Sequence, residues 1–418
     1  MAESAIITRV LHSLQQLPAK AWNDLLAHQA CPTPFMRHEY LCALEQSASA
    51  VPDTGWGPCV LTLWQGEELV AACMLYAKSH SYGEYVFDWA WARAYEQHGL
   101  AYYPKGLVAV PFTPVPGSRL LARSQGLREA LVRALQDFAQ AQQLSSLHLL
   151  FGDEADLAAC ASQGWMQRSN VQFHWSNRQG SGYTDFDDFL AALSQDKRKK
   201  IRQERRKVSE AGVRFRALHG PQIGADDLEF FYRCYERTYL EHGNAPYLSP
   251  QFFALQLQQM PQAWLLFIAE RHGQPIASSL IALSADAARH SALNKLEIVS
   301  RQALPAPESI APSGTAYGRY WGALERVDCL HFEACYYQPL AWCIERGIAS
   351  FEGGAQGEHK MARALLPQTT PSAHWIAHPS FAEAIERFLE REGQGMARYL
   401  DELQAHSPLR RPAQDICR

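Results

Sequence analysis

Residues 331–360 read HFEACYYQPLAWCIERGIASFEGGAQGEHK, and no other segment of the chain places so many polar groups beside apolar runs. The pattern predicts, in order, a strand over 330–333, an aromatic turn over 336–338, a short helix that ends at Gly347 and a strand over 348–352. A glycine-rich loop then leads to Lys360. Polar side chains on a buried scaffold are typical of a functional site, so we expect that site here.

The segments around this stretch occur in one order in both halves of the chain. The first half is predicted to contain a hairpin over 59–77, an aromatic strand over 85–89, a strand over 107–110, a helix over 126–143 and a strand over 146–151. The second half repeats the order with a hairpin over 264–283 and an aromatic strand over 315–322, followed by the elements of the quoted stretch. This repeat indicates a duplicated α/β unit with its boundary near residues 178–185.

The length of the chain also favours more than one domain. Single cores stop growing beyond ~250–300 residues, and the chain has 418. We expect an N-terminal domain over 1–180, a C-terminal domain over 181–405 that carries the site, and a mobile tail over 406–418. Residues 284–313 interrupt the second half with a loop-like composition and are predicted to form a surface excursion.

Composition excludes several classes of protein. With 47% hydrophobic and 20% charged residues, the chain resembles ordinary globular proteins and differs from disordered ones. The net charge of −4 gives no support for nucleic-acid binding over the whole surface. Ten cysteines without a CxxC pair favour reduced, buried thiols. Neither an export signal nor an apolar run of ~18 residues is evident, so we predict a cytoplasmic protein without a spanning helix.

The order of elements in the first half resembles the GNAT acyltransferase fold. In that fold the helix after the fourth strand opens with an Arg/Gln-x-x-Gly-x-Gly/Ala loop, which holds the pyrophosphate of coenzyme A at the helix N-terminus. The matching residues here are Arg123 to Arg128, in which Gly126 is the first glycine and Arg128 replaces the second small residue. This departure argues against an ordinary coenzyme A site in the first half.

The second half resembles the Fem-type peptidoglycan aminoacyltransferases and their relatives. LSQDKRKKIRQERRKVSEAGVRFR is similar to a Fem-type basic signature, and Gly353-Gly354 with downstream Lys360 resembles the Fem Gly-Gly and Phe-Lys segment, with His359 in place of Phe. FDWAWARAY, YYPKGLVAVPFTPVPGSRLL, YGRYWG, LHFEACYYQ and FEGGAQGEHKMAR together resemble a bacterial family of predicted N-acyltransferases of peptidoglycan biosynthesis or recognition. The insertion at 284–313 departs from that family.

This resemblance implies an architecture and a reaction. We expect tandem GNAT-like α/β domains, each a twisted mixed sheet flanked by helices, with the active site between them or in the second. The implied protein is an N-acyltransferase with an amine acceptor and with acyl-CoA as co-substrate, without a bound cofactor. Two alternatives stay open: an aminoacyl-tRNA-dependent enzyme acting on a cell-wall precursor, and a non-catalytic protein that binds such a ligand.

Amine acylation needs a neutral amine, an activated acyl group and a group that stabilises the oxyanion. Lys360 is the candidate for the oxyanion. Two glutamates at predicted strand ends can accept the ammonium proton, or can instead form ion pairs with Arg319, Arg346 or Lys360. The catalytic candidates are Lys360, Glu352, Glu333, His359 and Tyr337. The candidates for substrate or donor binding are Tyr336, Gln338, Gly353, Gly354, Gln356, Arg319, Tyr320, Trp321, Asp88, Trp89, Thr113 and Arg119.

A basic helix is predicted between the halves, with apolar residues from Phe186 to Val208 along one stripe. Its single-sign field attracts polyanions, among them coenzyme A phosphates, a nucleotide, transfer RNA and anionic lipid headgroups. The anion-binding candidates are Lys199, Arg202 and Arg206, and a solubilising surface is the alternative.

Metal and thiol chemistry have little support in the sequence. His331, Glu333, Glu352 and His359 can converge, yet no HExxH or Cys/His spacing accompanies them, so no metal is expected. Nothing marks a cysteine of the stretch as a reactive thiolate.

Overall fold

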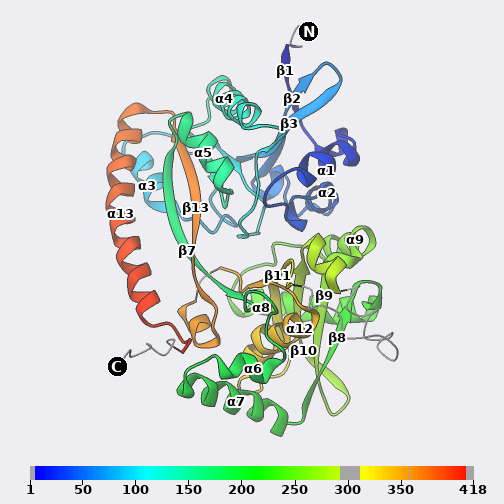
Figure 1. Ribbon diagram of the computed structural model, residues 1–418. Helices are drawn as coiled ribbons and strands as arrows, with labels where there is room; N and C mark the ends of the chain where they lie inside the picture. The colour runs from blue at the N-terminus through cyan, green and yellow to red at the C-terminus, as the bar shows by residue number, and fades with distance from the viewer. Residues whose placement is uncertain (1–4, 292–310, 356, 411–418) are drawn as a thin grey trace. The chain divides into compact units, whose positions relative to one another are not determined.

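The computed structural model describes residues 5–291, 311–355 and 357–410, which form two compact units (Figure 1). Unit 1 comprises Met1–Val171, Tyr247–Met260 and Thr369–Tyr399, and unit 2 comprises Gln172–Pro246, Pro261–Gln368 and Leu400–Arg418. Gln356, residues 292–310 of the predicted excursion and residues 411–418 of the predicted tail lie outside the described residues.

The units do not coincide with uninterrupted stretches of chain. Unit 1 takes two segments, 247–260 and 369–399, from the range predicted as the C-terminal domain. The domain bounds 1–180 and 181–405 therefore remain a prediction from the repeated order of elements. Units 1 and 2 each combine segments from both ranges.

Unit 1 is built on a sheet with the order β1-β2-β3-β4-β6-β13, and β5 pairs with β3. Its strands are β1 (Ile6–Leu11), β2 (Trp56–Gln65), β3 (Glu68–Lys78), β4 (Lys105–Val108), β5 (Leu121–Ala122), β6 (Ser146–Leu150) and β13 (Leu366–Ile376). Its helices are α1 (Ala19–Ala27), α2 (His38–Gln46), α3 (Trp89–Gln97), α4 (Gln125–Ala141), α5 (Glu154–Ser162), α9 (Pro250–Gln259) and most of α13 (Pro379–Ala405).

Unit 2 has the strand order β7-β12-β11-β10-β9-β8. The strands are β7 (Met166–Ser176), of which the part from Gln172 belongs to this unit, β8 (Val213–His219), β9 (Trp264–Arg271), β10 (Gln274–Leu283), β11 (Thr315–Ala323) and β12 (Ser350–Glu352). The helices are α6 (Phe186–Ala191), α7 (Gln195–Glu210), α8 (Ala225–Glu241), α11 (Leu330–Phe332), a π-helix (Glu333–Tyr337) and α12 (Gln338–Arg346), and a 3-10 helix covers Glu358–Arg363.

The two sheets repeat one pattern, which confirms the predicted tandem α/β duplication. In unit 1 the hairpin β2–β3 is followed by β4, which pairs antiparallel with β3 and parallel with β6. In unit 2 the hairpin β9–β10 is followed by β11, which pairs antiparallel with β10 and parallel with β12. The counterpart of β11 is therefore β4, and the aromatic strand predicted over 85–89 is wrong.

Each unit takes one strand of its strand order from the other half of the chain. β7 follows the first half, yet its residues 174–176 pair antiparallel with β12. β13 follows the second half, yet its residues 372–376 pair antiparallel with β6. This exchange of strands accounts for the segment 369–399 in unit 1, and α9 supplies the other segment, 247–260.

Helices cover both faces of the unit 1 sheet. Leu131 and Leu135 of α4 and Leu157 of α5 pack on one face, in a core with residues of β3, β4 and β6. On the other face, α3 and α13 form a second apolar cluster with Ile376. Among the described residues, no helix is long and apolar enough to cross a membrane.

The quoted stretch departs from its prediction at its start. Residues 330–346 are helical, so the strand over 330–333 and the aromatic turn are wrong, while Gly347 ends the helix as predicted with φ +65°. Buried Leu330, Ala334 and Tyr337 follow helical spacing, which a short apolar run cannot distinguish from a strand. The π-helix adds one residue to the turn, a feature common at functional sites.

Candidate functional site

The site is built where β11 and β12 stop pairing. Their parallel register ends at Tyr317 with Glu352, and a loop through Gly353 and Gly354 follows. A Cβ on Gly353 would lie 2.5 Å from Leu365 Cδ2, and Gly354 has φ +77°. Close packing therefore favours glycine at the first position, and the backbone conformation favours it at the second.

Lys360 lies inside this loop. Lys360 is only 3% exposed. Its Nζ donates to the carbonyl oxygens of Gly354 at 2.9 Å and Ala355 at 3.0 Å. Burial lowers the pKa of Lys360 to about 8. Among the described residues no carboxylate lies within ion-pair distance of it, so the ammonium orders the loop while its charge stays uncompensated.

A second group of side chains lies at the outer edge of the loop. His359 is exposed, and its Nε2 lies 3.2 Å from the hydroxyl of buried Tyr336. The ring of His331 lies 5.7 Å from that of Tyr336. Partial desolvation of the ring, together with the charges of Arg363 and Lys360, lowers the pKa of His359 below its ordinary value. Burial raises the pKa of Tyr336, so the phenol keeps its proton at neutral pH.

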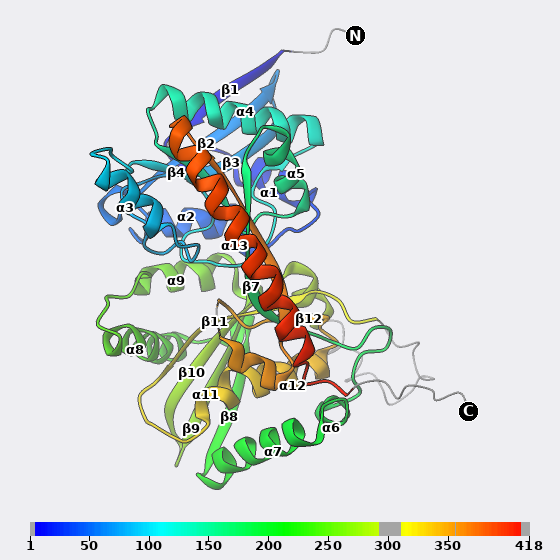
Figure 2. The same cartoon turned by 90° about the vertical axis from the view of Figure 1, so that its left-hand side faces the viewer.

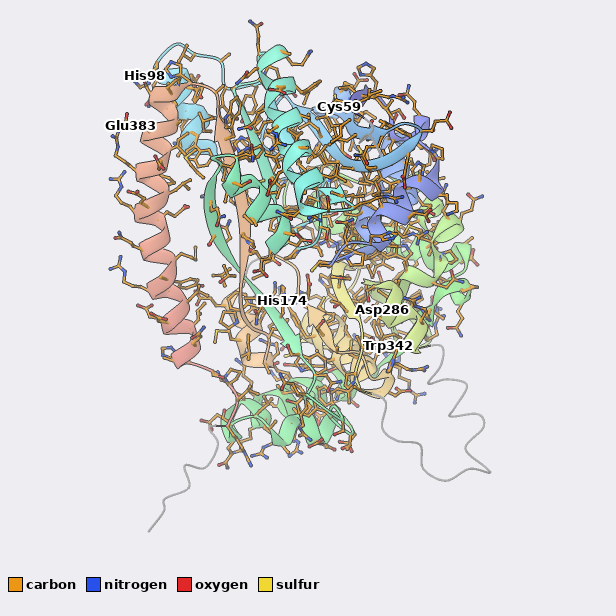
Figure 3. All side chains as sticks on the ribbon, turned by 45° about the horizontal axis from the view of Figure 1, so that its top comes forward. Cys59, His98, His174, Asp286, Trp342 and Glu383 are labelled. Carbon is orange, nitrogen blue, oxygen red and sulfur yellow. The ribbon has the colours of Figure 1, made fainter. Side chains whose placement is uncertain are left out.

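Glu352 ends β12 as predicted and faces a histidine that the sequence did not single out. His174 of β7, labelled in Figure 3, has Nε2 3.9 Å from Glu352 Oε2. Burial, reinforced by Lys360, lowers the pKa of His174 to about 4. The imidazole is therefore neutral at pH 7, and this contact is not a charged ion pair.

Tyr337 points away from the loop into a buried charged cluster. Its hydroxyl donates to Glu204 of α7 and accepts from Arg363 Nε at 3.2 Å. Arg363 Nη2 donates to Glu204 Oε2 at 2.9 Å, and Nη1 donates to the carbonyl of His359 at 2.7 Å. This cluster connects the basic helix to the segment that carries Lys360. Burial raises the pKa of Tyr337.

Glu333 does not end a strand and does not meet the cations predicted for it. Its carboxylate accepts from Arg205 Nε at 3.2 Å and from Gln338 Nε2 at 2.7 Å, whereas the predicted ion-pair partners were Arg319, Arg346 and Lys360. Burial raises the pKa of Glu333. The carboxylate lines a pocket of about 610 Å³ beside α6, α7 and β8.

That pocket, which we call the α7 groove, contains two of the three predicted anion-binding residues. Arg202 and Arg206 line it, together with Arg205, Arg214 and Gln338, whereas Lys199 does not. Figures 1 and 2 show α6 and α7 following each other next to β8. The predicted single helix is broken at residues 192–194.

The β11 candidates point to opposite faces of their sheet. Trp321 lies beside the site, with its ring 5.4 Å from that of His331. Tyr320 packs on the other face against Tyr235 of α8, at 5.4 Å. Arg319 lies with its guanidinium 5.3 Å from the ring of Tyr320.

The four candidates of the first half belong to unit 1, where Asp88, Thr113 and Arg119 are buried and Trp89 is partly exposed. Asp88 is buried and accepts from Lys105 and from the Tyr102 hydroxyl; burial opposes it, but Lys105 holds the pKa of Asp88 below its ordinary range. Trp89 begins α3 and its ring lies 5.1 Å from that of Tyr82.

Thr113 and Arg119 hold the proline-rich loop together. Thr113 donates to the carbonyl of Pro111 at 2.9 Å and contacts the hydroxyl of Tyr40 at 3.2 Å. Arg119 is 1% exposed and donates to the carbonyls of Leu150 and Gly117, each at 3.2 Å. Neither side chain is open to a ligand in this arrangement.

Sequence reasoning missed His174, and did not assign roles to Glu204 and Arg363. Glu204 is the one acidic residue between Lys197 and Lys207, and this isolated position was the available signal in the sequence. The nine cysteines of the described residues are free, and no group of three or more His, Cys, Asp or Glu side chains among those residues is arranged to hold a metal.

Comparison with known proteins gives one family. The model of a family described as FemAB-like, for peptidoglycan biosynthesis/recognition, matches residues 13–288 and 303–411. No match was found among curated protein sequences.

Solved structures of similar fold have low sequence identity to this chain. A C-terminal domain of a putative lysylphosphatidylglycerol synthetase from Agrobacterium fabrum is 10% identical with a TM-score of 0.49, over 89% of this chain and 96% of that one. FemX is 11% identical with a TM-score of 0.48, over 90% and 100%. A tandem GNAT protein of clavulanic acid biosynthesis is 11% identical with a TM-score of 0.40, over 89% and 98%.

Proposed function

Because the chain belongs to the FemAB-like family of peptidoglycan biosynthesis/recognition, we propose that it is a cytoplasmic N-acyltransferase acting on an amine of a cell-wall precursor. The donor is an acyl-CoA-type thioester, and no resident cofactor takes part. The glycine loop of unit 2 is the site of transfer. The predicted residues Lys360, His359, Gly353 and Gly354 meet there, with Tyr336, Trp321 and Glu352 around them.

The observation that carries this proposal is the environment of Lys360. An ammonium has three N–H donors, and two of those on Nζ are directed to the carbonyls of Gly354 and Ala355. The third is the donor that we assign to the oxyanion of the tetrahedral intermediate. A buried cation without a carboxylate partner stabilises developing negative charge far better than a solvated one.

Tyr336 and His359 supply the proton transfers. With its proton on Nε2, His359 donates to the Tyr336 oxygen and leaves Nδ1 to accept a proton from the attacking amine. The amine nitrogen bonds to the acyl carbon, the carbon–sulfur bond breaks, and the Tyr336 phenol protonates the thiolate. The Nε2 proton then passes to Tyr336 along the 3.2 Å contact. We assign this role to Tyr336 because Tyr337 is bonded to Glu204 and Arg363.

A second candidate has aminoacyl-tRNA as the donor, and the α7 cations favour it. Lys199, Lys200 and Arg202 are exposed on this helix, so its field is available to a polyanion.

Thermal-shift measurements with acetyl-CoA, longer acyl-CoAs, UDP-linked muropeptides and RNA separate these candidates. We expect an acyl-CoA to stabilise the unmodified chain, Lys200→Met and Lys360→Met alike, because Lys360 acts on the intermediate, and we expect Lys360→Met to lose most of the turnover. Stabilisation by RNA alone favours the second candidate. Ligand binding with no product detected from any donor in a separate turnover assay contradicts an enzymatic role.

A further inference from the structure

The α7 groove combines positively charged and apolar lining residues. Its volume of about 610 Å³ falls within the ~300–1,000 Å³ of small-molecule pockets. Arg202, Arg206 and Arg214 line it from α7 and β8, and Phe186, Val213 and Phe215 contribute apolar surface. Arginine forks of this kind match the geometry of phosphate oxygens.

The cations of the groove are largely available to a ligand. Arg202 contacts Asp187 at 3.1 Å, but the side chains are 59% and 80% exposed, so solvent weakens the ion pair. Arg206 lies 3.7 Å from Glu210 in an exposed contact of the same helix. Arg214 is exposed and has no ion-pair partner among the described residues.

The one buried carboxylate of the groove is already neutralised. Glu333 accepts from Arg205, which lies with its guanidinium 4.4 Å from the Phe186 ring, and from Gln338. A bound anion therefore meets a compensated carboxylate rather than a free one. Arg205 thus contacts both the Glu333 carboxylate and the Phe186 ring of the groove.

We propose that the α7 groove binds an organic diphosphate, with the phosphates on Arg202, Arg206 and Arg214 and an apolar or aromatic substituent against Phe186 and Phe215. Three guanidinium groups around one pocket can contact two adjacent phosphates. Inorganic phosphate has no apolar group to contact the apolar lining residues, whereas an organic diphosphate has one. RNA is the competing occupant, because exposed Lys200 and Lys207 extend the positive charge of α7 beyond the groove.

Coenzyme A and nucleoside diphosphates both contain an organic diphosphate. The groove can therefore hold a donor or an acceptor of the proposed acyl transfer, and in this respect the inference rests on the proposed function. Binding is measured without turnover, which keeps a failure here distinguishable from a failure of the transfer reaction. The probes are coenzyme A, UDP, geranyl diphosphate and inorganic diphosphate, titrated calorimetrically into the full chain at 0.15 M salt.

We expect at least one organic diphosphate to bind with a Kd below about 1 mM, and more tightly than inorganic diphosphate. Arg202→Ala/Arg206→Ala should weaken binding at least ~10-fold. Lys200→Ala/Lys207→Ala removes the same charge from the same helix outside the groove, and should weaken binding no more than ~3-fold.

Equal weakening by the two double variants would show a diffuse field and overturn the proposal. Failure of all three organic probes to bind, or binding of an RNA hairpin alone, would do the same. Arg202→Lys/Arg206→Lys keeps the charge but removes the forks, so an affinity equal to that of the unmodified chain would also count against it.

Discussion

Lys360 is held in the protein interior by two backbone carbonyls, an arrangement that ties the order of the glycine loop to one charged group. The charged form is disfavoured by burial, so the folded chain releases this proton at a lower pH than the unfolded chain does. The contribution of Lys360 to the free energy of unfolding therefore increases as pH rises from about 8 to 10.5, the ordinary pKa of a lysine.

This charge state is open to direct measurement. In protein labelled with 13C at lysine Cε, we predict one resonance that titrates near pH 8 and is missing from Lys360→Met. The resonances of exposed lysines serve as internal controls, whereas Lys78, whose pKa burial lowers to about 7, does not. A midpoint for this resonance near that of the exposed lysines would contradict the burial of an uncompensated ammonium.

A second prediction at this scale concerns Gly353. Its added Cβ would lie 2.5 Å from Leu365 Cδ2 and 3.3 Å from Lys360 Cδ, so Gly353→Ala should destabilise the protein by about 1–3 kcal/mol in urea denaturation. Gly126 of α4 has open space around the same position, and Gly126→Ala should be neutral or stabilise by about 0.4–1 kcal/mol. Equal effects would argue against tight packing of the loop.

The sequence indicated several residues of the site but not their contacts. Lys360, His359 and the two glycines meet as the motif implied. The partners of Lys360 are carbonyl oxygens, which depend on loop conformation rather than residue type. Glu333 was placed at a strand end because residues 330–333 were interpreted as a strand, and its helical position turns it towards Arg205 instead.

At the scale of elements, three side chains of the π-helix point in different directions and contact different parts of unit 2. Glu333 faces the α7 groove, Tyr336 faces His359, and Tyr337 contacts Glu204 and Arg363. An α-helical turn alone places residues 333 and 337 on one face, so the inserted residue helps to separate the roles. Sequence periodicity does not predict such an insertion, which explains why this segment was the least accurate part of the prediction.

The cluster that connects α7 to the 3-10 helix carries a prediction of its own. Arg363→Met leaves Glu204 buried without its cation and should cost about 3–5 kcal/mol of unfolding free energy. Adding Glu204→Met should cost less than the sum of the two single changes, because the uncompensated charge is gone. Urea denaturation of all four proteins measures this coupling, and additive effects would contradict it.

At the scale of the whole molecule, the strand exchange makes the two halves depend on each other. The first half supplies β7 to the sheet of unit 2, and the second half supplies β13 to the sheet of unit 1. The duplication itself was visible in the order of elements, because each hairpin and each amphipathic helix has a local pattern. The exchange was not, since strand pairing between distant segments leaves no local signal.

We therefore predict that fragments 1–180 and 181–405 do not fold separately. Each should lack cooperative unfolding in circular dichroism, whereas the two co-expressed should associate and recover a cooperative transition. A cooperative transition in fragment 1–180 alone would show that β13 is dispensable for unit 1.

The central claim is that the glycine loop of unit 2 transfers an acyl group to an amine, and mass spectrometry of the product tests it most directly. The purified chain is incubated with an acyl-CoA and a muropeptide that carries a free amine. We predict an acylated muropeptide, formed about 10²–10³-fold more slowly by Lys360→Met and at an unchanged rate by Lys200→Met. Acylation that proceeds equally fast in Lys360→Met would contradict the account.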